Sequence, residues 1–151
     1  MENTKNEMVV WSNTFACGIK ILDAQHKILI NIINDMFSHV TGSEKDEKDY
    51  LFDVVHHITD YIKLNFSTEE KIMLAAKYDG YLKHKKEHDD FILEFIDMVN
   101  EYLLGKKLTL FILTKYLKDW ILSHISVMDK NYFKYYREIK EKIDLPAAAS
   151  Y

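Results

Sequence analysis

Apolar residues recur along this chain at intervals of three and four, and strict alternation of apolar and polar residues is rare. That spacing predicts amphipathic α-helices, because positions three and four apart share one face of a helix. Three polar or glycine-containing segments, TGSEKDEK, KYDGY and GKK, interrupt the pattern. The sequence therefore predicts four helices, at about 23–40, 49–76, 81–104 and 109–143.

Four amphipathic helices with short connections favour an all-α fold, an up-down-up-down four-helix bundle in which each helix turns one apolar stripe inward. We expect an N-terminal arm that packs on the bundle (1–20), the bundle itself (21–145) and a disordered tail (146–151). Asp23 is expected to be the N-cap of the first helix. With 151 residues, 48% of them hydrophobic, the chain can bury the core of one domain.

Composition narrows the classes of protein to consider. The net charge is −4 and Arg137 is the single arginine, so no basic patch for nucleic acid is expected. Charged residues interrupt every apolar run short of the roughly 20 residues that a membrane span needs. The polar N-terminus does not resemble a secretory leader, which predicts a cytoplasmic protein. Cys17 is the only cysteine, so an internal disulfide is excluded and metal ligands would be nitrogen and oxygen atoms.

The histidines divide into two sets when each helix is advanced by about 100° per residue. His39, His56 and His57 fall away from the predicted interior. The others lie on the first, third and fourth helices: His26, His84, His88 and His124. Alone, His26 would be a hydrogen-bonded core histidine, and His84 and His88 would be a solvated pair on one helix face.

Two carboxylates change this interpretation. Glu69 lies on the second helix, and Asp129 follows His124 by five residues. A five-residue step rotates by about 140°, so Asp129 either stretches across or the helix contains a local π-bulge. Buried carboxylates need a counter-charge, so with four imidazoles they predict a dinuclear metal site with both carboxylates between the ions. Such donors suit iron, and also zinc or manganese.

The segments LDAQH, NFSTEEKIM, HKKEHDDF and HISVMD, in this order, resemble the hemerythrin family, and within it the single-domain bacteriohemerythrins, from Trp11 to about Tyr132. The resemblance implies two non-haem iron ions with an oxo or hydroxo bridge that bind dioxygen reversibly, hence an oxygen-binding protein and not an enzyme. It implies that one iron is held by His84, His88 and His124, the other by His26, and both by Glu69 and Asp129. It also implies an apolar dioxygen pocket lined by Leu29, Phe66, Trp120, Ile121 and Ile125.

The chain departs from the family at one position, where Asn65 replaces a histidine that binds the second iron. An amide oxygen is a weaker donor than an imidazole, so Asn65 ligates weakly, water replaces it, or only one metal is held. Dioxygen transport, storage or sensing is the leading function. A di-iron oxidase or peroxidase-like enzyme and an iron reservoir are the alternatives. Gln25 either supports the ligands or lies on the surface, and no protein partner is predicted.

Overall fold

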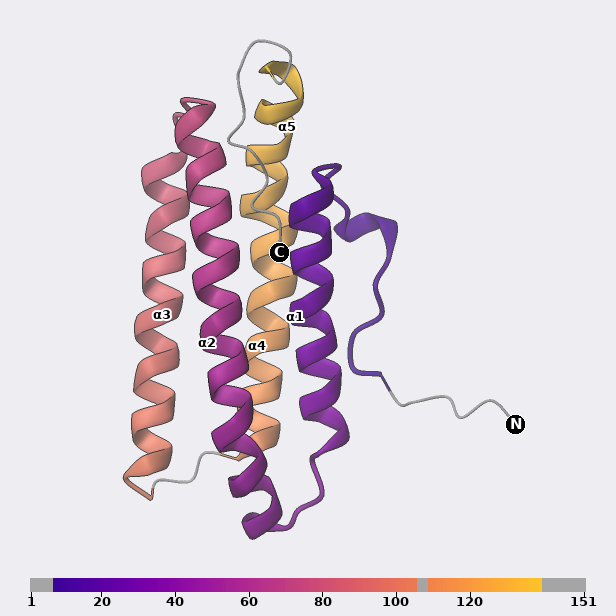
Figure 1. Ribbon diagram of the computed structural model, residues 1–151, viewed down its shortest axis with the longest axis vertical. Helices are drawn as coiled ribbons and strands as arrows, with labels where there is room; N and C mark the ends of the chain where they lie inside the picture. Colours follow the sequence, from indigo (N-terminus) through magenta and orange to yellow (C-terminus); the bar gives the residue numbers. More distant parts are fainter. Residues whose placement is uncertain (1–6, 106–108, 140–151) are drawn as a thin grey trace, which may run out of the picture.

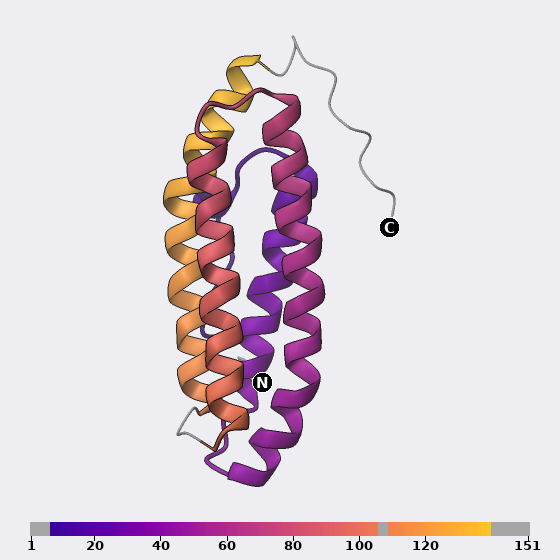
Figure 2. The ribbon, with the colours of Figure 1, turned by 90° about the vertical axis from the view of Figure 1, so that its left-hand side faces the viewer.

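The computed structural model describes residues 7–105 and 109–139, and its helices form an antiparallel four-helix bundle (Figures 1 and 2). The helices are α1 (Lys20–Ser38), α2 (Glu44–Ala75), α3 (Tyr81–Leu103) and α4 (Leu110–His124). Beyond α4 the fourth arm continues through a π-helical segment, η2 (Ile125–Asp129), into α5 (Lys130–Ile139). The described residues contain no strand, and the predicted all-α, up-down-up-down fold is confirmed.

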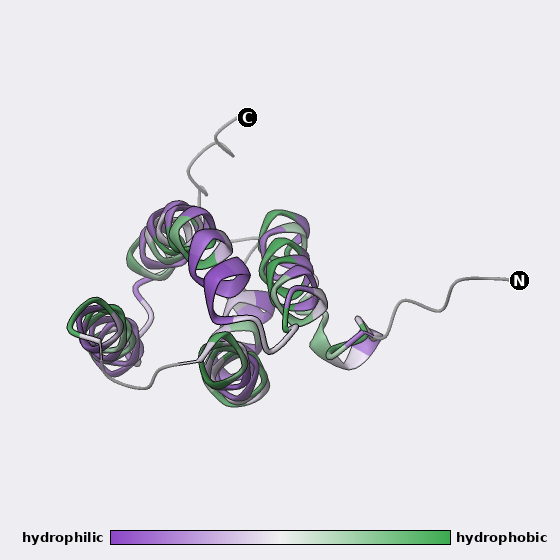
Figure 3. Cartoon of the chain, turned by 90° about the horizontal axis from the view of Figure 1, so that it is seen from below, coloured by the Kyte–Doolittle hydropathy of each residue, from purple (hydrophilic) through white to green (hydrophobic). Residues whose placement is uncertain are grey.

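Two apolar clusters form the core, and a buried polar layer lies between them along the helices. The larger cluster includes Leu29 and Ile33 of α1, and α2, α3 and α4 also contribute residues to it. The smaller cluster includes Leu22, Met73 and Phe133. Figure 3 shows hydrophobic and hydrophilic residues on the same helices, as expected for amphipathic helices. The polar layer consists of residues that are almost fully buried: Gln25, His26, Asn65, Glu69, His84, His88, His124 and Asp129.

The N-terminal segment lies alongside α1 (Figure 1) and contains a short 3-10 helix, η1 (Asn13–Phe15). The side chain of Asn34 of α1 forms three hydrogen bonds with the backbone of this segment. The Asn34 Oδ1 accepts from the N–H groups of Met8 and Val9, both at 2.9 Å, and Nδ2 donates to the Val9 carbonyl at 2.7 Å. The predicted tail at 146–151 lies outside the described residues.

The structure corrects the predicted start of the first helix. α1 begins at Lys20 with Ile19 as its N-cap, so the prediction that Asp23 is the N-cap was wrong. The Asp23 carboxylate instead lies in the first turn and accepts hydrogen bonds from the N–H groups of Cys17 at 2.8 Å and Gly18 at 3.2 Å. It therefore ties the preceding loop to the helix, a role that residue type alone does not separate from capping.

α2 begins at Glu44, five residues earlier than predicted. The charged segment EKDEK, taken for a connection, is helical because acidic side chains in a first turn interact favourably with the helix dipole. The Glu47 carboxylate also reaches back to the N–H groups of Thr41 and Gly42 at 2.9 and 2.8 Å. The start of α4 agrees closely with the sequence, since Thr109 is its N-cap and accepts from the Ile112 N–H at 3.2 Å.

Candidate metal centre

All four arms of the bundle contribute to the buried polar layer. His26 comes from α1, Glu69 from α2, His84 and His88 from α3, and His124 from the end of α4. Asp129 closes the set from η2. The structure thus brings together the six candidate ligands that the sequence predicted, in two groups that share Glu69. It leaves His39, His56 and His57 exposed, as expected.

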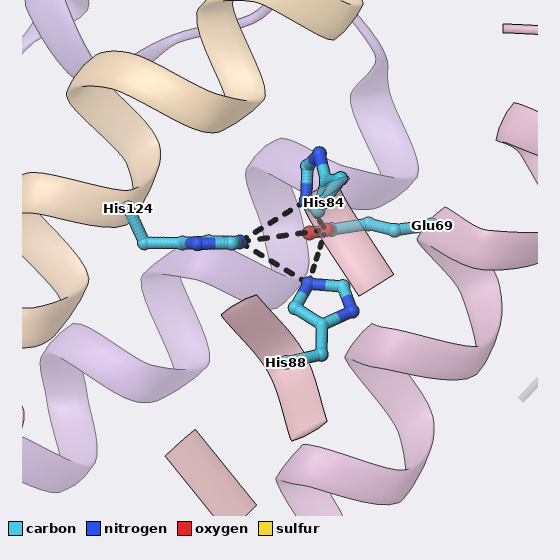
Figure 4. Close-up of side chains that lie close together, drawn as sticks. All are labelled: Glu69, His84, His88 and His124. Atoms are coloured by element: carbon cyan, nitrogen blue, oxygen red, sulfur yellow. Dashed lines mark hydrogen bonds and ion pairs between the residues drawn. The ribbon is translucent and has the colours of Figure 1, made fainter. Parts of the chain in front are cut away.

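We call Glu69, His84, His88 and His124 the three-histidine group (Figure 4). The His124 Nε2 lies 3.2 Å from the His84 Nε2 and 3.1 Å from the His88 Nε2. The Oε2 of Glu69 lies 3.2 Å from the Nε2 atoms of both His84 and His88. Three ring nitrogens and one carboxylate oxygen therefore converge on a common point, as ligands of one cation do.

His26, Glu69 and Asp129 form the second group, which we call the His26 group. The His26 Nε2 lies 3.3 Å from Oε1 of Glu69 and 3.1 Å from Oδ2 of Asp129. The other oxygen of Asp129, Oδ1, lies 3.1 Å from the His124 Nε2 and 3.2 Å from the His84 Nε2. Each carboxylate thus presents one oxygen to each group, which is the geometry that a bridge between two cations requires.

The position of Asp129 depends on the π-helical segment. In a regular α-helix its side chain would lie about 140° round the axis from His124. η2 covers Ile125–Asp129 and widens this turn, so both side chains enter the same interior. Of the two outcomes that the sequence allowed, the structure shows the bulge.

Aromatic rings and a second carboxylate hold the imidazoles in place. The ring of Phe66 stacks on His88 at 3.8 Å between centroids, and Trp120 stacks on His124 at 4.4 Å. The Nδ1 of His88 lies 3.1 Å from the Glu70 Oε1, to which its N–H donates. This bond leaves the His88 Nε2 with a free lone pair toward the centre. Glu70 was not predicted from the sequence, although a buried imidazole usually needs a partner for its second nitrogen.

Asn65 is buried beside the His26 group, and a short chain of hydrogen bonds sets the orientation of its amide. The Thr68 hydroxyl donates to the Leu64 carbonyl at 2.7 Å, so its oxygen is left to accept from the Gln25 Nε2 at 3.2 Å. Gln25 therefore turns Oε1 toward Asn65 and accepts from its Nδ2 at 2.9 Å. Gln25 thus supports the layer, and the amide oxygen of Asn65, its only good metal donor, is left free of Gln25.

The electrostatics of the layer favour bound cations. Glu69 and Asp129 are 0% exposed, and buried anions are costly without a counter-charge. Burial alone would lower the pKa of His26 and of His124. The negative charges of Asp129 and Glu69 outweigh burial and raise these pKa values to about 9 and about 10. The same imidazoles hold the pKa of each carboxyl well below its ordinary value, against the effect of burial.

The residues predicted to line a dioxygen pocket surround this layer. Leu29, Phe66, Ile121 and Ile125 are buried, and Trp120 is partly buried against the same cluster. Two of the five, Phe66 and Trp120, stack directly on imidazoles of the three-histidine group.

Fold and site together define a class: a helical bundle whose interior holds a histidine and carboxylate cluster fit for two cations. The family model described as the hemerythrin HHE cation binding domain matches residues 17–136. The chain therefore belongs to the hemerythrin family, and this membership supports a non-haem di-iron protein that binds dioxygen. No helix among the described residues has the length and apolar character to cross a membrane.

Individual relatives agree with this assignment. The chain is 25% identical over 126 residues to a bacteriohemerythrin of Methylococcus capsulatus, covering 83% of this chain and 94% of the relative. It is 30% identical over 125 residues to a hemerythrin of Themiste dyscrita, covering 83% and 88%. A crystal structure of wild-type hemerythrin is similar in fold, with a TM-score of 0.74 and 24% identity, over 84% of this chain and 96% of that one.

Proposed function

We propose that this chain binds two iron ions through the six candidate ligands of the polar layer, and binds dioxygen at the ion held by the His26 group. The observation that carries the proposal is the placement of Glu69 and Asp129, each with one oxygen toward either group. When bound, the iron pair would supply the electrons for reversible dioxygen binding. The surrounding residues would hold the ions and exclude water.

The two positions differ in how firmly this chain can hold an ion. The three-histidine group offers three imidazole nitrogens, with Glu70 behind His88 and stacked rings on two imidazoles. The other position has one imidazole, from His26, besides the two carboxylates. Asn65 adds its amide oxygen, which is directed away from Gln25. The second position is therefore the weaker one, and it has room for a ligand from solvent.

Three aliphatic side chains suit the second position to an apolar ligand. Leu29 is one turn along α1 from His26, and Ile121 and Ile125 lie on the fourth arm beside His124. All three are at most 2% exposed. Their packing would admit dioxygen and keep water and protons from a ligand at this position.

Asn65→His tests the assignment of the weaker position. Because imidazole is a stronger donor than an amide oxygen, the second iron should bind at least about tenfold more tightly in this variant. Asn65→Leu, of similar volume and without a donor, should retain about one iron per chain. Metal analysis after dialysis against a weak chelator measures both, with circular dichroism to verify folding. Equal iron retention in all three proteins would contradict the role of Asn65.

Dioxygen binding itself can be tested by stopped-flow mixing. The reduced, iron-loaded protein should give an absorption change with dioxygen that reverses when the gas is removed. Repeated consumption of peroxide would instead indicate a peroxidase-like enzyme. Slow oxidation without a reversible intermediate spectrum would indicate an iron reservoir.

A further inference from the structure

Tyr61 of α2 is a buried polar residue that the centre described so far does not use. Its side chain is 3% exposed, and its hydroxyl has no hydrogen-bond partner among the described residues. A buried hydroxyl without a partner destabilises a fold. A bound ligand that accepts a hydrogen bond from this hydroxyl would offset that cost.

The register of α2 places Tyr61 on the side of the His26 group. Tyr61, Asn65 and Glu69 follow one another at intervals of four, so they share one helix face. Asn65 turns that face toward Gln25 of α1. The neighbouring row turns toward α3, because Phe66 stacks on His88. Tyr61 therefore lies one turn from Asn65, on the helix face that carries Asn65 and Glu69 into the polar layer.

The surroundings of Tyr61 suit a hydrogen-bond donor to a small ligand. It belongs to the same apolar cluster as Leu29, Ile121 and Ile125, the side chains around the proposed ligand position. Burial raises the pKa of Tyr61 well above its ordinary value, and the charges of Glu69 and Asp129 raise it further. The phenol therefore stays protonated, as a hydrogen-bond donor must.

We propose that the Tyr61 hydroxyl donates a hydrogen bond to the small ligand, dioxygen or a small anion, that binds the cation of the His26 group. The inference rests on the proposed function, since it needs a cation at that position. Tyr61 would select ligands that have a terminal atom with a lone pair, and would slow their release into the surrounding apolar cluster.

Tyr132 of α5 provides a matched control. It is also fully buried with an unpartnered hydroxyl, but its ring contacts the His84 ring edge-on at 6.2 Å, on the side of the three-histidine group. It packs in the smaller cluster with Leu22 and Met73. Tyr132→Phe therefore makes the same chemical change at the same depth, beside an imidazole of the three-histidine group.

Azide is a suitable probe of the oxidised, iron-loaded protein, because its binding can be followed by visible absorption. Tyr61→Phe should weaken azide binding by about tenfold, the effect of one hydrogen bond to a charged acceptor. Tyr132→Phe should change it less than about twofold. In the metal-free protein, Tyr61→Phe should leave the melting temperature unchanged or raise it, because no hydrogen bond is lost there.

A second measurement reports the hydrogen bond directly. The infrared stretch of bound azide should shift between H2O and D2O in the unmodified protein and in Tyr132→Phe, and should not shift in Tyr61→Phe. Equal azide affinities and equal isotope shifts in all three proteins would overturn the role of Tyr61. Failure of the unmodified protein to retain iron would overturn the proposed function instead, so the two failures are distinguishable.

Discussion

At the scale of single residues, the proposed weakness of the second position rests on the Asn65 amide, which a chain of hydrogen bonds orients. The Thr68 hydroxyl donates to the Leu64 carbonyl, so its oxygen accepts from Gln25. This fixes the orientation of the Gln25 amide, which in turn fixes that of Asn65. Each step follows from which atoms can donate and which can accept. The result is a buried asparagine whose amide is held in one direction, with its oxygen turned away from Gln25.

Glu70 is predicted to strengthen metal binding without touching a cation. Its carboxylate accepts from the His88 Nδ1 at 3.1 Å, and removal of such a partner commonly weakens metal affinity by about 10- to 100-fold. Glu70→Ala should show a loss in this range, measured by competition with a chelator. Glu87→Ala, an exposed carboxylate next to His88 in sequence, is the control. A Glu70→Ala protein that binds as tightly as the Glu87→Ala protein would contradict this role.

The sequence predicted the six candidate ligands because their types and helical spacing are visible in one dimension. It did not predict the contact of Glu70 with His88 or single out Tyr61, and it left Gln25 open between support of the ligands and the surface. The contacts of these residues depend on which side chains of different helices meet. Helical periodicity alone does not determine such pairings. Asp23 illustrates the same limit, since its type fits both a cap and a loop anchor.

At the scale of elements, η2 is the feature that lets one arm of the bundle supply two ligands five residues apart. A π-bulge behaves as one extra residue within an otherwise continuous α-helix. Before the bulge, α4 turns Leu117 and Ile121 inward, and after it α5 turns Tyr132 and Phe133 inward. The sequence indicated the bulge through the spacing of His124 and Asp129, because both residues needed to face the interior.

Deletion of Val127 tests this description of the fourth arm. Val127 is 55% exposed within η2, and its removal should convert the bulge into regular α-helix without rotating the residues that follow. We expect a folded protein with nearly unchanged helix content, measured by circular dichroism, and with Tyr132 and Phe133 still buried.

Deletion of Lys115, an exposed residue in the regular part of α4, is the matched control. It should rotate Leu113 by about 100° relative to Leu117. The buried side chains on one side of the deletion would then no longer face the core. The melting temperature should therefore fall far more than for the Val127 deletion. If both deletions are equally damaging, η2 is not a removable insertion.

At the scale of the whole molecule, the sequence predicted the bundle well, because four amphipathic stretches allow few other arrangements. The helix boundaries were less accurate, and Phe52, an apolar residue of α2, is 56% exposed. The buried row is instead Leu51, Val54 and Ile58. In the sequence, a charged first turn of a helix resembles a polar loop. Two neighbouring apolar rows of one helix also resemble each other until their packing partners are known.

The stability of the whole molecule should depend on pH differently with and without metal. In the metal-free protein, the folded-state pKa values of His26 and His124 are about 9 and about 10, above the ordinary value of 6.5. Their stabilising contribution is therefore complete below pH 6.5, and it is lost as pH rises through 9 and 10. The free energy of unfolding should fall by at least about 1 kcal/mol across this window.

The iron-loaded protein should not show this loss, because a cation binds the unprotonated imidazoles. The difference in the free energy of unfolding between the loaded and metal-free proteins should therefore widen as pH rises. Urea unfolding between pH 6.5 and 10 measures this difference. His56→Ala, which removes an exposed histidine, should leave both profiles unchanged. Parallel profiles for the two forms would contradict the assignment of His26 and His124 as ligands.

The two fully buried carboxylates also set a charge balance for the interior. Two divalent ions carry four positive charges, and Glu69 and Asp129 neutralise only half of them, since imidazole ligands are neutral. The surplus lies in a medium of low polarity, where an uncompensated charge is costly. Oxidation to trivalent ions would enlarge it, so the bundle would exchange electrons only together with negatively charged species from solvent or with the release of protons.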